Sequence, residues 1–259
     1  MPDITFQAAG LTWPGYLAVP AGNRPTGTEP TDAGSAGTAS GSTGGRWPGV
    51  VVIHEAFGLN DDVRRKADEL AAHGYLALAP DLFDGKSWIR CIRSAFQQMR
   101  AGRGPAFETL DGARSFLAER PDCTGKTGVI GFCMGGGFAL LCAPRPGFEV
   151  AAVNYGDVPK DAERALAGAC PIVGSFGGRD AMGTAGPERL QRALAVLEVP
   201  HDVHIYPGSG HRFMTQSSGP AAVLSKIARM SYQPADAADA WQRIYRFFGT
   251  YLADDDSKS

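Results

Sequence analysis

Short apolar runs and helical spacings alternate along this chain. Continuous apolar runs, several of them β-branched, predict strands at 49–53, 75–79, 148–155, 170–176 and 202–206, and a further strand through Val129 and Ile130. Between them, apolar residues three and four positions apart predict helices at 61–74, 87–102, 105–119, 187–197 and 237–252. This order predicts an α/β fold with a mainly parallel sheet and helices on both faces.

The N-terminal part of the chain follows a different pattern. Residues 4–8 and 16–19 predict two short strands, and Trp13-Pro14-Gly15 between them is typical of a turn, so we expect an antiparallel hairpin. From about 21 to 47 the composition is dominated by Gly, Thr, Ser, Ala and Pro. Such a stretch has too little apolar surface to offset the entropy of ordering, and we interpret it as a flexible surface insertion.

The strand through Val129 and Ile130 ends in a glycine-rich turn around a cysteine. Gly131-Phe-Cys-Met-Gly135 has the form G-x-C-x-G, and the small and apolar residues after it favour a helix. With serine at its centre, this pattern is the nucleophile elbow of α/β-hydrolases, a sharp strand-to-helix turn that lifts one side chain above the sheet. Cys133 keeps the geometry and supplies a thiol. The alternative is a buried core cysteine in a glycine-rich turn.

An acid and a histidine follow in the order that such a site requires. Asp180 lies in Gly177-Gly-Arg-Asp180, just after one predicted strand, and His211 lies in Pro207-Gly-Ser-Gly-His211, just after the next. Loops of this kind present side chains at the carboxyl edge of a parallel sheet. Either residue alone has an ordinary explanation as a loop residue. Together with Cys133, they predict a catalytic triad.

Length and charge narrow the possible functions. With 259 residues the chain can bury a full core, and we expect a single domain over 1–252 with a disordered tail at 253–259. A net charge of −2, with 20% charged residues, gives no electrostatic basis for binding nucleic acid or an anionic membrane. The N-terminus lacks a signal-peptide pattern and no apolar run approaches the roughly 20 residues of a membrane span, so we expect a cytoplasmic protein.

The number and spacing of the cysteines bear on disulfide formation and on metal binding. They stand at positions 91, 123, 133, 142 and 170, an odd number without a C-x-x-C pair. This pattern indicates neither a disulfide framework nor a zinc site. We therefore expect reduced thiols and no metal or other cofactor.

Five short motifs are spread along the chain. They are Gly131-Phe-Cys-Met-Gly135, His54-Glu-Ala-Phe-Gly-Leu-Asn60, Ala79-Pro-Asp-Leu82, Gly178-Arg-Asp180 and Gly210-His211. Together they resemble the dienelactone hydrolase family, from the N-terminal hairpin to the C-terminal helix and without the insertion. The resemblance implies a single-domain α/β-hydrolase fold without a large lid. It also implies the hydrolysis of dienelactone (carboxymethylenebutenolide) to maleylacetate in chlorocatechol breakdown.

The resemblance further implies roles for residues around the thiol. In the family, the glutamate that matches Glu55 sits against the resting thiol and takes part in its activation when substrate binds. The alternative for Glu55 is a solvent-facing carboxylate at a strand end. The oxyanion hole would come from the backbone N–H groups of Met134, after the nucleophile, and Ala56, after the first parallel strand.

Substrate recognition follows the family pattern less closely. Family enzymes bind the substrate carboxylate through two arginines, one after the Pro-Asp-Leu motif and one shortly after the catalytic histidine. Here Arg90 or Arg93 is the candidate for the first and Arg212 for the second, with Phe57 as a further candidate. None of these arginines matches the family in position, and a helix-surface arginine is more often solvated than bound to a ligand. The identity of the substrate therefore stays open.

These observations predict a cysteine-dependent hydrolase that cleaves a small ester or lactone through a covalent thioacyl intermediate, as a monomer or small homo-oligomer. Its partner is then a small-molecule substrate. Two alternatives remain. A thioesterase or a promiscuous carboxylesterase would use the same fold. A non-catalytic ligand-binding or thiol redox-sensing protein would keep the fold, with Cys133 as its reactive thiol.

Overall fold

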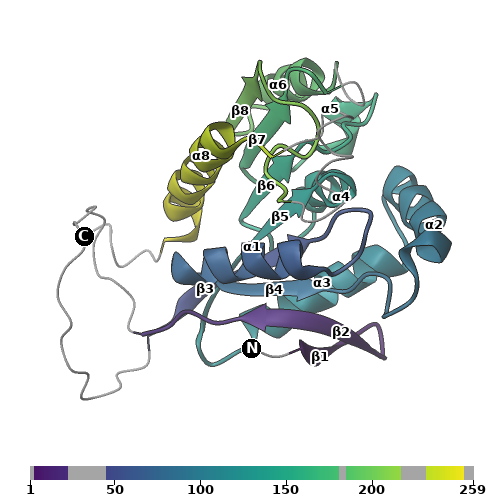
Figure 1. Cartoon of the computed structure of the whole chain (residues 1–259), viewed down its shortest axis with the longest axis vertical. Helices are drawn as coiled ribbons and strands as arrows, with labels where there is room; N and C mark the ends of the chain where they lie inside the picture. Colours follow the sequence, from purple (N-terminus) through teal and green to yellow (C-terminus); the bar gives the residue numbers. More distant parts are fainter. Residues whose placement is uncertain (1–2, 23–44, 181–184, 217–231, 254–259) are drawn as a thin grey trace.

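A mixed sheet forms the centre of the protein (Figure 1). The structure is a computed structural model that describes residues 3–22, 45–180, 185–216 and 232–253. Within these ranges, eight strands pair in the order β1-β2-β4-β3-β5-β6-β7-β8. Their bounds are β1 Asp3–Ala8, β2 Leu11–Ala18, β3 Trp47–Ile53, β4 Leu76–Pro80, β5 Cys123–Phe132, β6 Val150–Asn154, β7 Ile172–Gly177 and β8 His201–Tyr206. Strands β3 to β8 are parallel, while β2 is antiparallel to both β1 and β4.

Helices cover both faces of this sheet. Their bounds are α1 Asp61–Ala72, α2 Trp88–Ala101, α3 Pro105–Ala118, α4 Met134–Cys142, α5 Ala162–Ala165, α6 Gly186–Val196 and α8 Pro234–Leu252. Helices α1 and α8 pack on one face through residues such as Val63 and Phe248. Helices α2 to α6 pack on the other through residues such as Leu110, Phe138 and Leu190. The predicted α/β architecture is confirmed.

Strand β3 shows why the central runs are apolar throughout. All of its residues are buried. Val50 and Val52 contact the layer of α1 and α8, whereas Val51 and Ile53 contact the opposite layer. Side chains alternate between faces, so a strand that is covered on both faces needs an apolar residue at every position. The parallel pairing places the carboxyl ends of the central strands at one edge, where the loops that follow them converge.

The predicted N-terminal hairpin is present, but its turn is not where we expected it. Ala9 and Gly10 join β1 and β2, with φ values of 50° and 75° that suit a tight hairpin turn. The segment predicted as the turn, 13–15, lies inside β2. Pro14 is tolerated there because its pairing with β4 starts one residue later, and its carbonyl accepts a hydrogen bond from Asp81 N–H at 2.9 Å.

Smaller differences concern the ends of elements. Trp47 was assigned to the insertion, but it is buried and begins β3, where its N–H donates to Asp122 O at 2.9 Å. Residues 23–44 of the predicted insertion at about 21–47, and residues 254–259 of the predicted tail at 253–259, lie outside the described residues. Helix α5 was not predicted because a single turn is too short to show a periodicity. Within the described ranges, no helix combines the length and apolar character needed to cross a membrane.

Candidate active site

Cys133 occupies a strained turn between β5 and α4. Its φ of 55° and ψ of −118° lie in a region that costs a residue with a side chain about 1–3 kcal/mol. Close backbone approaches enforce the turn. A Cβ on Gly131 would come within 1.9 Å of Gly135 O, and one on Gly135 within 2.3 Å of Ile53 O. Glycine is therefore required on both sides of the cysteine, as in a nucleophile elbow.

The thiol lies at the end of a hydrogen-bonded chain of three side chains. His211 Nε2 is 3.1 Å from Cys133 Sγ, and His211 Nδ1 is 2.7 Å from Asp180 Oδ2. The histidine and the aspartate are buried, whereas the cysteine is half-buried. One ring nitrogen is thus held by the carboxylate while the other faces the sulfur. This is the arrangement that a nucleophile and its oriented base require.

The charges around His211 favour its protonated form. Burial by itself would lower the pKa of His211, but the hydrogen bonds and negative charges of Asp180 and Cys133 raise it to about 10. An imidazolium donates from both ring nitrogens. It therefore gives one hydrogen bond to the carboxylate and one to the sulfur, and the sulfur acts as an acceptor.

Backbone contacts fix the two loops that carry the acid and the histidine. A Cβ on Gly177 would lie 2.5 Å from Gly210 O, so the two loops touch through their backbones. Ser209 Oγ donates to Asp236 Oδ2 at 2.6 Å, which ties the histidine loop to the first turn of α8. The positions of the two side chains are thus set by the ends of β7 and β8 and by one helix.

A second buried group of charges lies beside this chain and centres on Glu55. Arg212 Nε donates to Glu55 Oε2 at 2.7 Å. The hydroxyl groups of Thr215 and Tyr155 donate to Oε1 at 2.5 and 3.3 Å. The Glu55 side chain is only 3% exposed. Because Glu55 follows β3 and Arg212 follows the histidine, this cluster joins the loop after β3 to the loop after β8.

Arg212 makes an aromatic contact in addition to its ion pair. The guanidinium carbon lies 5.1 Å from the centre of the Phe57 ring, which is itself 45% exposed. A cation at this distance from a ring face is attracted to it. Arg212 and Phe57 therefore lie together, and Arg212 directly follows His211 in the chain.

Three of the other cysteines are less suited to nucleophilic chemistry. Burial raises the pKa of Cys123 and Cys142, and it raises that of Cys170 to about 12. All five cysteines are free. Among the described residues, no three His, Cys, Asp or Glu side chains are grouped so as to hold a metal ion. Cys133 has a histidine partner, and the chemistry of the site therefore centres on it.

A comparison with the profiles of known protein families shows to which family the chain belongs. The profile of the dienelactone hydrolase family matches residues 35–252. The chain belongs to the dienelactone hydrolase family. The predicted resemblance is confirmed, and the protein is a hydrolase of this family.

Curated relatives match over most of their length. A protein of Synechocystis sp., provisionally assigned as a carboxymethylenebutenolidase, is 29% identical over 227 residues, which cover 80% of this chain and 88% of the relative. A protein of Escherichia coli K12 with the same provisional assignment is 27% identical over 224 residues, 80% of this chain and 78% of the relative.

Solved structures share the fold. A Klebsiella pneumoniae protein, provisionally assigned as a dienelactone hydrolase, superposes with a TM-score of 0.74 at 24% identity, over 96% of this chain and 98% of the other. A dienelactone hydrolase-like promiscuous phosphotriesterase from metagenomic libraries gives 0.73 at 21% identity, over 97% and 98%. These similarities confirm the predicted α/β-hydrolase fold.

Two arginines expected from the family resemblance lie on α2. Arg90 and Arg93 are exposed on α2, whose buried face is formed by Ala95 and Met99 and packs on α3 and α4. Figure 1 shows α2 at the opposite side of the view from α8. In the described part of the chain, neither arginine contacts the cysteine, the histidine or the aspartate. Of the three candidate arginines, Arg212 is the one that directly follows His211 and pairs with Glu55.

Glu55 has a different partner from the one the family resemblance implies. The resemblance predicts that Glu55 faces the resting thiol, but in the structure its oxygens bond to Arg212 and two hydroxyl groups, and the thiol bonds to His211. Arg212, which directly follows the histidine, brings a cation to the carboxylate. The role of Glu55 at the thiol stays a prediction, whereas the alternative, a solvent-facing carboxylate, is wrong, since Glu55 is buried.

The two candidate oxyanion-hole residues lie on neighbouring backbone segments. Met134 is the first residue of α4, where backbone N–H groups have no acceptor within the helix. A Cβ on Gly135 would lie 2.6 Å from His54 O, so the loop that contains Ala56 passes close to this helix end. The structure thus brings both segments to the thiol.

His54 stabilises the loop that contains Ala56. It is buried, and burial lowers its pKa, so the ring is neutral near pH 7. His54 Nδ1 donates to Glu55 O at 2.6 Å, and Nε2 accepts from Leu82 N–H at 3.1 Å. The two bonds together specify the tautomer and anchor the loop to the segment after β4.

Three residues near the site were not predicted from the sequence. Tyr155, with a φ of 41°, follows β6 and places its ring 5.2 Å from that of His211. Thr215 and Lys66 contact the Glu55 cluster from the histidine loop and from α1. The sequence does give an indication for Lys66, because this residue lies on the same helical face as the apolar residue Val63. It gives none for Thr215, since only the tertiary fold brings that residue to Glu55.

Proposed function

We propose that this protein is a cysteine-dependent hydrolase that cleaves a small ester or lactone, of the dienelactone type, through a covalent thioacyl intermediate. The observation that carries the proposal is the alignment of Cys133 Sγ, His211 and Asp180, at 3.1 and 2.7 Å. The assignment of curated relatives as carboxymethylenebutenolidases supports the same class of bond. The strained elbow that presents the sulfur supports a catalytic role for it.

The first step acylates the thiol. With the one mobile proton of the Cys133–His211 pair on the imidazole, Cys133 Sγ forms a bond to the carbonyl carbon, and the carbonyl π electrons move to the oxygen. The N–H groups of Ala56 and Met134 hydrogen-bond this oxyanion. When the intermediate collapses, the bond from carbon to the alkoxy oxygen breaks, and His211 donates its proton to that oxygen. A lactone opens in this step, so its alcohol remains attached to the acyl group on sulfur.

The second step releases the product. A water molecule attacks the thioester carbon while His211, now neutral, accepts a proton from that water. The carbon–sulfur bond breaks, the carboxylic acid leaves, and Cys133 and His211 together hold one mobile proton again, as before the first step. Asp180 accepts the Nδ1–H bond throughout and keeps Nε2 directed at the reacting atoms.

Arg212 and Phe57 are the proposed substrate-binding residues. Glu55 uses the Nε of Arg212, and within the described residues the two Nη groups have no hydrogen-bond partner. The arginine side chain is 14% exposed, which leaves a cation within reach of a ligand. A substrate carboxylate would bind there, and the exposed Phe57 ring would contact its apolar part. Glu55 is proposed to support catalysis by holding this arginine in place.

Two other functions use the same residues. A thioesterase or a carboxylesterase requires the same triad and differs only in the group that leaves. A redox sensor requires an accessible thiol, but it needs neither the strained elbow nor an aspartate that orients the histidine. Those two features favour a catalyst over a sensor or a binding protein.

A substrate panel tests the proposal. Short esters, thioesters and lactones, each with and without a carboxylate, are assayed with the wild type and with Cys133→Ala. Turnover far beyond one equivalent by the wild type, and none above background by the variant, is the expected result. Product formation that stops at one equivalent would favour the binding or sensing protein. A strong preference for thioesters would favour the thioesterase.

A further inference from the structure

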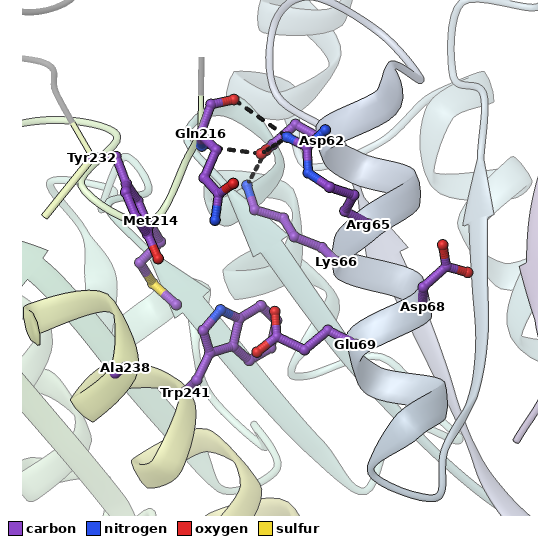
Figure 2. A pocket seen from close by; sticks show the side chains of 10 residues that line it. All are labelled: Asp62, Arg65, Lys66, Asp68, Glu69, Met214, Gln216, Tyr232, Ala238 and Trp241. Carbon is purple, nitrogen blue, oxygen red and sulfur yellow. Dashed lines mark hydrogen bonds and ion pairs between the residues drawn. The ribbon is translucent and has the colours of Figure 1, made fainter. Parts of the chain in front are cut away.

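Lys66 is a buried ammonium group on the core-facing side of α1. The residue is 4% exposed. Its Nζ lies 2.7 Å from Asp62 Oδ2, 3.0 Å from Thr215 Oγ1 and 3.9 Å from the centre of the Phe132 ring. Figure 2 shows its side chain running along α1 toward Asp62, at the edge of a cavity of about 410 Å³ between α1 and α8. A buried lysine is costly unless paired, so its partners define its role.

The donors around Thr215 determine the direction of its hydroxyl group. An ammonium group has no acceptor, so Thr215 Oγ1 accepts from Lys66. Tyr155 OH lies 3.0 Å from Thr215 Oγ1 and 3.3 Å from Glu55 Oε1, and it has one proton for these two oxygens. The single Thr215 proton goes to Glu55 Oε1, because that oxygen lies at 2.5 Å and belongs to a carboxylate, which only accepts. The hydrogen bonds therefore run from Lys66 through Thr215 to Glu55.

The backbone at Arg212, the ion-pair partner of Glu55, is strained and needs contacts that stabilise it. Arg212 has a φ of 65°, a left-handed conformation that is unfavourable for a residue with a side chain. Its ion pair with Glu55 is one of the contacts that hold this residue, together with the hydrogen bond from Thr215 N–H to Arg212 O at 2.8 Å. Because His211 is the preceding residue, a change in the Arg212 backbone would displace the ring that faces the thiol.

We infer that Lys66 and Thr215 are positioning residues for hydrolysis. The ammonium group orients the Thr215 hydroxyl, and the hydroxyl orients the Glu55 carboxylate. Glu55 in turn holds Arg212, the neighbour of His211. The inference rests on the proposed function, because both residues act through the triad and not on the substrate.

A matched pair of variants separates this role from a general effect of charge on α1. Lys66→Met removes the ammonium group and keeps an apolar stem against Phe132. Arg65→Met is the control: Arg65 is the adjacent residue and also pairs with Asp62, at 2.9 Å, but its side chain is 51% exposed and it has no bond to Thr215.

A second pair of variants tests the hydroxyl. Thr215→Val removes it at nearly constant volume, and Thr215→Ser restores it. The double variant Lys66→Met with Thr215→Val completes a double-mutant cycle, which measures whether two residues act through one interaction. All variants are assayed for kcat/KM with the best ester or lactone of the panel, and their thermal unfolding is recorded.

The expected pattern is specific to a shared hydrogen bond. Lys66→Met and Thr215→Val each lower kcat/KM by about tenfold, the size expected for a lost hydrogen bond to a charged group. The kcat/KM of the double variant is no more than about twofold below that of the less active single variant. Thr215→Ser recovers to within about threefold of the wild type, and Arg65→Met stays within about twofold.

Other outcomes overturn the inference. It fails if folded Lys66→Met has the kcat/KM of the wild type or of Arg65→Met, or if the two single effects multiply in the double variant. If Lys66→Met does not fold, the threonine pair decides: equal activity of Thr215→Val and Thr215→Ser excludes the role. Failure of the proposed function itself is recognised separately, because Cys133→Ala would then retain turnover in the same assay.

Discussion

Two groups of polar side chains meet at the carboxyl edge of the sheet, and they are built differently. The Cys133, His211 and Asp180 chain is linear and ends at a half-buried sulfur. The Glu55 cluster is closed in the sense that each of its acids, Glu55 and Asp62, is paired with a cation, Arg212 and Lys66 respectively. A linear chain with an accessible end can act on a substrate, whereas a closed cluster satisfies its own charges and holds the loops that carry the chain.

The largest effect should come from the end of the linear chain. Cys133→Ala is expected to lower kcat/KM by about 10³-fold or more, since the remaining groups cannot form the covalent bond. The fold should persist, because a smaller side chain fits the elbow. Cys133→Ser should retain little activity, since a hydroxyl is a far weaker acid than a thiol. Steady-state kinetics and far-ultraviolet circular dichroism measure both, and full activity of Cys133→Ala would refute the assignment.

The next largest effect concerns the acid. Asp180→Asn should lower kcat/KM by about 10²- to 10⁴-fold, because the histidine loses its orienting acceptor. The variant also tests the charge of His211. The folded-state pKa of about 10 lies above the ordinary value of 6.5, so this group stabilises the fold fully below pH 6.5 and loses that contribution as the pH rises through about 10.

Chemical denaturation at pH 7 and pH 10 measures this contribution. The wild type should lose more unfolding free energy between the two pH values than Asp180→Asn, in which the pKa of His211 is raised less. Equal losses in the two proteins would show that the aspartate does not hold the proton on His211.

A smaller effect is expected in the closed cluster. Glu55→Gln keeps the shape of the side chain and removes its charge, so the Arg212 ion pair is weakened and kcat/KM should fall by about tenfold. Because the thiol bonds to His211 and not to Glu55, the rate of Cys133 alkylation by iodoacetamide should not rise. Faster alkylation in Glu55→Gln would place the carboxylate against the thiol. The Glu55 cluster and the Cys133, His211 and Asp180 chain would then not be separate groups.

The smallest effect is expected outside both groups. Arg90→Ala and Arg93→Ala should leave kcat/KM within about twofold, because both side chains are exposed on α2. Arg212→Gln, in contrast, should raise KM more for a substrate with a carboxylate than for a neutral ester. A carboxylate-specific loss in either α2 variant would assign substrate recognition to that helix.

The linear chain was predictable because each of its residues has a local signal. Cys133 lies between two glycines after an apolar run, and Asp180 and His211 each follow a predicted strand. In a parallel sheet the ends of those strands meet at one edge, so order along the chain translates into proximity in space.

The closed cluster was not predictable, because it depends on tertiary distances. The sequence alone does not show that Thr215 reaches Glu55, 160 positions earlier, or that Arg212 pairs with the same carboxylate. The turn of the N-terminal hairpin was predicted at the wrong place for a similar reason. The Trp13-Pro14-Gly15 segment is a stronger turn signal than Ala9-Gly10, but pairing of β2 with β1 and β4 keeps it extended.

The most direct test of the account is to find the acyl group on the enzyme. A nitrophenyl ester is mixed with the protein, the reaction is quenched in acid within milliseconds, and the peptides are analysed by mass spectrometry. We expect a burst of about one equivalent of nitrophenol and a peptide whose Cys133 carries the acyl mass, released by hydroxylamine and absent from Cys133→Ala. A burst in which Cys133 stays unmodified, or an acyl group on another residue, would contradict the account.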